Sequence, residues 1–241
     1  MAPREPASRD LRRMALAGDE LEYVLVRRRG RRGVGLRVDE KGLTVSAPAA
    51  MPLVRIEALV RESERWVRKK IAEWSARKVP PVHWRDGERL PFLGGGLTLR
   101  VFAGARSRAQ RRGDELHATA RDGAHEVERA VVRWYKRAAH EYLAERVRTL
   151  SHEARLVPPK LAISPALTRW GSCNSRREVR LAWRLVKAPV ELIDYVICHE
   201  LAHLRHMDHS AAFWAEVERQ CPDYRQRRKR LHATDHLYRT F

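Results

Sequence analysis

The chain of 241 residues is long enough to bury a substantial core, as one large domain or two small ones. Hydrophobic residues make up 44% and charged residues 33%, which is the balance of an ordinary water-soluble protein. No apolar run approaches the ~20 residues needed to cross a bilayer, and the N-terminus lacks the apolar segment of a signal peptide. We therefore expect a cytoplasmic protein with no membrane contact.

The net charge of +19 is concentrated in three arginine clusters, namely RRRGRR at 27–32, RSRAQRR at 106–112 and RQRRKR at 225–230. One interpretation is a polyanionic partner, such as nucleic acid or nucleotide phosphates. The other is a basic surface with no partner, in a protein from a GC-rich genome that encodes basic positions as arginine. No nucleic-acid-binding motif accompanies the charge, which favours the second interpretation.

The first half of the chain is predicted to be rich in β-strands. Residues 1–19 form an N-terminal tail in this interpretation, and short alternating runs separated by glycine over 20–47 predict a small β-meander. Pro52 opens a long amphipathic helix that ends before Pro80, and more strand-like sequence follows. We expect a β-rich N-terminal region over 20–120 that contains this one long helix.

A second region is predicted over 121–241, beginning with a helix from about Ala124 to about His152. KLAIS and EVRLAWRLV then have the pattern of strands, and in the latter every second residue is apolar, so one face can be buried. Pro189 is placed to start a helix over VELIDYVICHELAHLRH. No internal repeat is visible in the sequence. The fold class that this pattern indicates is α+β, with a boundary near residue 120.

The segment CHELAHLRHMDHSAAFW contains four histidines. His199 and His203 are one helical turn apart on a largely apolar helix, so both imidazoles can reach one metal ion. His206 lies about 10 Å from His199 along the helix axis, too far to bind the same ion. Ser210 is a suitable N-cap for a following helix, so the first helix should end before it. His209 falls in that break, and we expect it to be the third ligand of a Zn²⁺ ion.

Glu200 stands beside these ligands in the pattern HExxH. In such sites the glutamate stays off the metal and accepts a proton from the water at the open fourth position. An alternative third ligand is a carboxylate from the next helix, Glu216 or Glu218. Cys198 points about 100° away from His199 around the helix, and the three cysteines are expected to be reduced thiols outside the site.

The HExxH motif, the histidine six positions after it and the SAAFW that follows resemble the YgjP-like metallopeptidase family, which is related to the SprT-like and WLM zincins. RWGSC at 169–173, RLAWRL at 180–185 and GERLPFL at 87–93 are similar to further segments of that family. Ala182 stands where an asparagine is common in the family.

The resemblance implies a zincin-like metallopeptidase core, with a small mixed sheet and an active-site helix, that hydrolyses peptide bonds with a zinc ion. It also implies an edge strand that pairs with an extended peptide, for which EVRLAWRLV is the candidate. A plain internal strand is the other interpretation of that segment.

The substrate and partners stay open in the sequence. The family has also been credited with pyrophosphohydrolysis of nucleoside triphosphates, for which Arg169, Arg180 or Arg184 could hold the phosphates. A DNA-associated protease, or a basic protein whose zinc only stabilises the fold, is a third class. Tyr195, Trp170 and Arg169 are candidates for stabilising the oxyanion, and the oligomeric state is not predicted.

Overall fold

The computed structural model describes residues 8–16, 18–39, 41–77, 79–121 and 123–241. The chain divides into two compact units, Met1–Lys78 and Val79–Phe241. The division therefore falls after residue 78, and not near residue 120 as the sequence analysis expects. The reason is that the strands between residues 89 and 120 form a sheet that packs against the long helix directly after it. No helix in the described part of the chain is long and apolar enough to cross a membrane.

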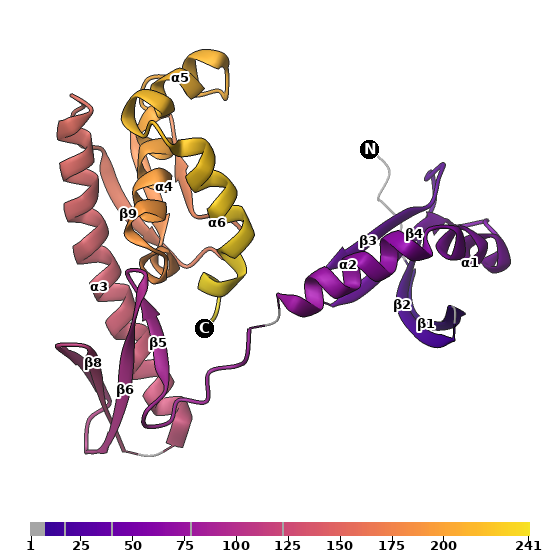
Figure 1. The fold of residues 1–241 in the computed structure, drawn as a ribbon, viewed down its shortest axis with the longest axis horizontal. Coiled ribbons are helices and arrows are strands. Elements are labelled where there is room, and N and C mark those ends of the chain that lie inside the picture. The colour runs from indigo at the N-terminus through magenta and orange to yellow at the C-terminus, as the bar shows by residue number, and fades with distance from the viewer. Residues whose placement is uncertain (1–7, 17, 40, 78, 122) are drawn as a thin grey trace. The chain divides into compact units, whose positions relative to one another are not determined.

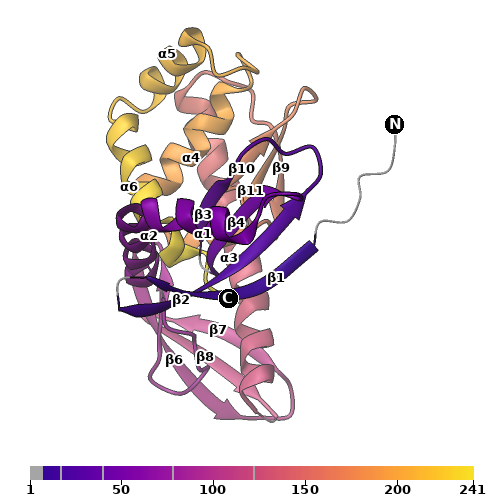
Figure 2. The same cartoon turned by 90° about the vertical axis from the view of Figure 1, so that its right-hand side faces the viewer.

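The first unit is a four-stranded sheet with two helices packed on it (Figure 2). The sheet has the order β1-β2-β4-β3, and its central strands β2 and β4 run parallel. Its elements are β1 (Ser8–Leu16), β2 (Asp19–Arg28), β3 (Gly35–Asp39), β4 (Gly42–Pro48), α1 (Leu53–Glu62) and α2 (Glu64–Ala76).

Two sequence-based expectations for this unit are wrong. β1 is a strand where residues 8–16 were expected to belong to a tail, because it pairs with β2 along its whole length. The single helix predicted after Pro52 is two helices that meet at Ser63, whose φ of −92° and ψ of 8° leave the helical region. The hydrophobic pattern continues across Ser63, so periodicity alone does not reveal the break.

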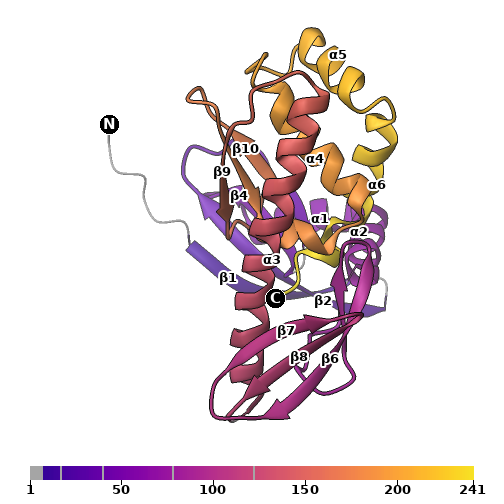
Figure 3. The same cartoon turned by 90° about the vertical axis from the view of Figure 1, so that its left-hand side faces the viewer.

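The second unit begins with another four-stranded sheet, of order β5-β6-β8-β7, built from β5 (Arg89–Phe92), β6 (Gly95–Ala103), β7 (Arg108–Arg112) and β8 (Glu115–Ala120). Like the first sheet, it joins two antiparallel hairpins through a central parallel pair, a structural repeat that the sequence does not reveal. One face, with the buried Leu99 and Leu116, packs against the first half of α3 (Gly123–Glu153), as Figure 3 shows. The predicted helix from about Ala124 is thus confirmed.

The rest of the second unit carries the histidines. A small mixed sheet of order β10-β11-β9 comes first, followed by a 3₁₀ segment, Trp183–Lys187, and three helices (Figure 1). The elements are β9 (Lys160–Ser164), β10 (Gly171–Cys173), β11 (Glu178–Ala182), α4 (Val190–Ala202), α5 (Ala211–Gln220) and α6 (Tyr224–Tyr238). The predicted α+β class, with a small mixed sheet and a helix that bears the HExxH motif, is confirmed.

The strand predicted over EVRLAWRLV ends at Ala182, and it is not an edge strand. β11 pairs with β10 on one side and with β9 on the other, so both of its hydrogen-bonding edges are occupied. The free edge beside α4 belongs to β10, which contacts that helix. The internal-strand interpretation of this segment is the correct one.

Two interactions fix α4 in place. Its apolar residues, such as Ile193 and Ile197, are fully buried in the core of the second unit. Asp194 forms a two-pronged ion pair with Arg146 of α3, with N–O distances of 2.6 and 2.8 Å. The helix that presents the histidines is therefore held both by apolar packing and by a directional contact to the longest helix of the unit.

Candidate metal centre

The end of α4 brings two histidines onto one side of the chain. α4 starts after Pro189, whose carbonyl accepts from the amides of Leu192 and Ile193, and ends at Ala202. His203 still has helical angles, φ −63° and ψ −19°, so it remains one turn from His199 on the same face.

The chain then turns back. Ser210 caps α5, its side chain accepting from the amide of Phe213 at 3.4 Å, and the cap that the sequence predicts is confirmed. His209 precedes this cap and returns toward α4.

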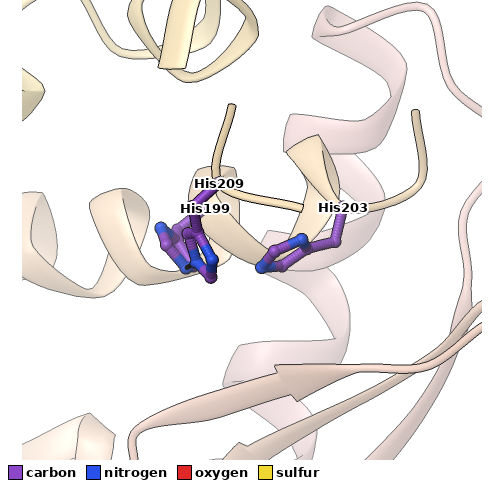
Figure 4. Close-up of side chains that lie close together, drawn as sticks. All are labelled: His199, His203 and His209. Carbon is purple, nitrogen blue, oxygen red and sulfur yellow. Dashed lines mark hydrogen bonds between the residues drawn. The ribbon is translucent and has the colours of Figure 1, made fainter. Parts of the chain in front are cut away.

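The imidazoles of His199, His203 and His209 converge (Figure 4). One nitrogen from each lies within 4.8 Å of the other two, and the Nε2 atoms of His199 and His209 are 3.4 Å apart. Two nitrogens bound to a tetrahedral zinc at 2.0–2.1 Å would lie about 3.3–3.4 Å apart. These three residues are the group of potential metal ligands found in the described part of the chain, and they are the three that the sequence nominates.

The ring of His203 is oriented by a main-chain contact. Its Nδ1 lies 3.1 Å from the carbonyl oxygen of His206, and since a carbonyl only accepts, Nδ1 must carry the proton. Nε2 is then unprotonated and can bind a metal, which is the usual arrangement for a histidine ligand. His206 thus contributes through its backbone and not through its imidazole. His199 Nδ1 is buried and has no hydrogen-bond partner among the described residues.

Two aromatic residues of α5 surround the imidazoles. Phe213 is fully buried, and its ring centroid lies 5.0, 4.5 and 4.8 Å from those of His199, His203 and His209. Trp214 lies 5.8 Å from His199 and stacks on Tyr224 at 5.4 Å. The sequence alone assigns these rings no role, although SAAFW follows the last histidine directly.

Burial favours the neutral form of two of the imidazoles, those of His199 and His203. Burial, together with the neighbouring His203 and His209, lowers the pKa of His199 to about 4. Burial also lowers the pKa of His203. Neutral rings retain the lone pairs that a metal requires, so the electrostatics of the cluster suit metal binding at neutral pH.

Glu200 is buried beside the histidines, with 5% of its surface exposed. Its Oε2 has no hydrogen-bond partner among the described residues. Burial raises the pKa of this carboxyl to about 8, and the positive charge of Arg169 opposes the shift. A carboxyl of this kind can take up and release a proton near neutral pH.

A cavity of about 220 Å³ opens beside these groups. Tyr195 lies in its wall, and burial raises the pKa of this phenol to about 12, so it stays protonated at neutral pH. The cavity combines apolar walls with two potentially reactive side chains, those of Glu200 and Tyr195. This is the usual composition of an active site. Its lining residues are Trp170, Gly171, Tyr195, Val196, His199, Glu200 and Leu231.

The carboxylates considered as alternative third ligands lie outside the cluster. Glu216 is ion-paired with Arg219 at 2.7 Å and with Arg205 at 3.6 Å. Glu218 lies 4.0 Å from Arg225 at the surface. The cysteines are free, as expected, and burial raises the pKa of Cys198 to about 12, which disfavours the thiolate that metal binding needs.

Of the three arginines proposed to hold a triphosphate, one is near the site. Arg169 is close enough to Glu200 to lower its pKa. Arg180 is exposed on the face of β11 opposite to the buried Leu181. Arg184 donates to the carbonyls of Phe241 and Pro165 and stacks over Trp183, with its Cζ 4.3 Å from the ring centroid.

Three imidazoles beside a buried glutamate, in an α+β unit, are the features of a metallopeptidase-type hydrolase that uses a metal ion. Residues 32–234 match the family model described as the YgjP-like metallopeptidase domain, and the chain belongs to that family. No curated protein matches the chain. The crystal structure of the metallopeptidase zymogen of Pyrococcus abyssi abylysin is similar at 23% identity, over 37% of this chain and 90% of that one, with a TM-score of 0.35.

Proposed function

We propose that the protein is a zinc-dependent peptidase in which His199, His203 and His209 hold the metal and Glu200 is the general base. The observation that carries this proposal is the 3.4 Å between the Nε2 atoms of His199 and His209, with Glu200 in the wall of the adjoining cavity. Neutral imidazoles suit zinc, and three protein ligands leave a fourth position for chemistry.

Glu200 lies where a general base is needed, in the wall of the same cavity as His199. When bound, zinc supplies a Lewis acid for the scissile carbonyl. The unpartnered Oε2 of Glu200 accepts a proton from the attacking water and transfers it to the leaving nitrogen. The phenol of Tyr195, protonated at neutral pH, donates a hydrogen bond to the oxygen on which negative charge develops.

The edge of β10 is the place for an extended peptide in this proposal. β10 begins at Gly171, which lines the same cavity as Glu200, and its outer edge has no partner strand in the described sheet. A substrate that adds to this edge gains main-chain hydrogen bonds and places its backbone beside the carboxylate. β10 therefore replaces β11 as the candidate substrate-binding strand.

Hydrolysis of nucleoside triphosphates is the rival activity. It requires arginines directed at the site, and Arg180 and Arg184 are exposed on the opposite face or engaged elsewhere. To compare the two activities, zinc-loaded protein is incubated with a mixed peptide library and, separately, with a panel of nucleoside triphosphates. Peptide products without pyrophosphate release support the peptidase. Pyrophosphate release without peptide products overturns it.

A further inference from the structure

The outer face of the sheet β5-β6-β8-β7 is basic and carries an exposed aromatic ring. α3 covers the other face, where Leu99, Leu116 and Ala118 are buried. The strand register sets the outward residues in three rows, which are Phe102, Thr119, Arg108, then Arg100, His117, Gln110, then Thr98, Glu115, Arg112. Figure 3 shows these strands side by side.

Phe102 gives this face a flat stacking surface. Its side chain lies on a central strand, yet the residue is 48% exposed, and its ring centroid is 5.1 Å from that of His117. The two rings border a cavity of about 390 Å³ whose other walls are polar, formed by Arg108, Gln110, Arg112 and Thr119. Exposed rings on an open sheet are the surface on which unpaired bases stack in single-strand-binding proteins.

The charges on this face are not all neutralised. Glu115 pairs with Arg100 at 2.8 Å and with His117 at 2.7 Å, so these three side chains satisfy one another. Arg108 and Arg112 have no ion pair or side-chain hydrogen bond to any described residue. They lie four residues apart on the edge strand β7, about 13 Å along the strand.

The other two arginine clusters are more fully engaged. In the cluster 225–230, Arg227 pairs with Asp223 at 2.8 Å and Arg230 with Glu191 at 2.8 Å. In the cluster 27–32, Arg27 donates to the carbonyls of Ala49 and Met51. The cluster 106–112 thus combines free guanidinium groups with a neighbouring aromatic surface.

We propose that the outer face of this sheet binds single-stranded nucleic acid. Bases stack on Phe102 and His117, while successive phosphates lie along β7 against Arg108 and Arg112. A duplex does not fit this arrangement, because its bases are stacked on each other and cannot reach the rings. Because the two arginines are about 13 Å apart along the strand, a ligand that contacts both must be longer than one nucleotide. The inference does not depend on the metal centre.

The test is fluorescence anisotropy of a labelled 20-nucleotide single-stranded DNA of mixed sequence, titrated with full-length protein at several salt concentrations. Phe102→Ala should weaken binding about 5- to 150-fold, as expected for loss of one stacked base, and Phe102→Trp should restore it. Arg108→Ala with Arg112→Ala should weaken binding and reduce the slope of log affinity against log salt by about 1.4.

Two controls separate this face from general charge. Arg55→Ala with Arg65→Ala removes the same charge from exposed positions of the first unit, and Trp66→Ala removes another exposed ring. Neither should change affinity more than twofold. Equal losses in the control pair and the Arg108/Arg112 pair overturn the proposal, as does unchanged affinity in Phe102→Ala. Competition with ATP is a further test. If ATP displaces the labelled strand completely at the same nucleotide concentration as an unlabelled strand does, the proposal is also overturned, because a mononucleotide site would then explain the binding.

Discussion

Glu200 occupies the space that a side chain on residue 171 would need. A β-carbon placed on Gly171 would overlap the carboxylate, lying 2.6 Å from Cγ and 2.7 Å from Cδ. The backbone of Gly171 has no positive φ, so the requirement is for space and not for conformational freedom. Glycine at this position lets the edge strand and α4 approach each other with the carboxylate between them.

Gly171→Ala should therefore displace Glu200 and lower kcat about 100-fold, since a shift of about 1 Å in a catalytic group costs that much. Zinc content should be unchanged, because the three atoms nearest to the added β-carbon all belong to Glu200 and not to a histidine. Ser172→Ala is the control. Ser172 lies opposite Arg180 in the strand register, so its side chain is on the face of the sheet away from Glu200. Steady-state kinetics on a peptide that the protein cleaves gives kcat for both variants. A kcat of Gly171→Ala equal to that of the wild type would contradict the expected displacement of Glu200.

His209 and His206 should differ sharply when each is replaced by alanine. His209→Ala removes an imidazole that lies 3.4 Å from His199 and should weaken zinc affinity more than about 100-fold. His206→Ala keeps the carbonyl that orients His203 and should change the affinity little. Competition with a chromogenic chelator gives both values. Equal losses in the two variants would remove His209 from the ligand set.

The ion pair between Asp194 and Arg146 should contribute to the stability of the second unit. Asp194→Ala leaves the guanidinium without its partner and should destabilise the unit by about 2–3 kcal/mol, less than a fully buried pair because the Arg146 side chain is 30% exposed. The double variant Arg146→Met with Asp194→Leu should recover most of the loss. Calorimetry of the full chain measures this, and no change in the melting temperature of Asp194→Ala would contradict it.

Stability of the metal-free protein should depend on pH through Glu200. Its pKa in the folded state is about 8, above the ordinary value of 4.5, so folding favours the protonated form. The stability that this provides is complete below about pH 4.5 and is lost as the pH rises through 8. Relative to Glu200→Gln, the chelator-treated wild type should therefore lose on the order of 3–5 kcal/mol between pH 5 and pH 9.

The comparison with Glu200→Gln isolates this carboxyl, because other groups titrate in both proteins. Lys187, whose pKa burial lowers to about 6, is one of them, and it shifts stability in the opposite direction above pH 6. Parallel curves of unfolding free energy against pH for the two proteins would show that Glu200 is not held protonated by burial.

The local signals in the sequence predicted the histidine cluster well. The spacing of His199 and His203 fixes their common face, and the capping preference of Ser210 indicated where the chain turns back, which placed His209 at the cluster. Helical periodicity likewise predicted α3 to within a residue at each end. These features depend on residues close together in the chain, where geometry leaves few alternatives.

The features that the sequence did not predict depend on contacts between distant segments. Gly171 and Glu200 are 29 positions apart, and nothing local tells that the glycine provides space for that carboxylate. The same holds for Asp194 and Arg146, and for the pairing that makes β11 central. The domain boundary near residue 120 was wrong, because the sequence of the strands before α3 does not show which helix those strands pack against.

In the proposed function, Glu200 performs proton transfer at a zinc site held by three histidines. The most direct test compares peptide cleavage by wild type and Glu200→Gln at equal, measured zinc content, with products identified by mass spectrometry. We expect equal zinc in both proteins and products from the wild type alone. Equal turnover by the two proteins would contradict the assignment of Glu200.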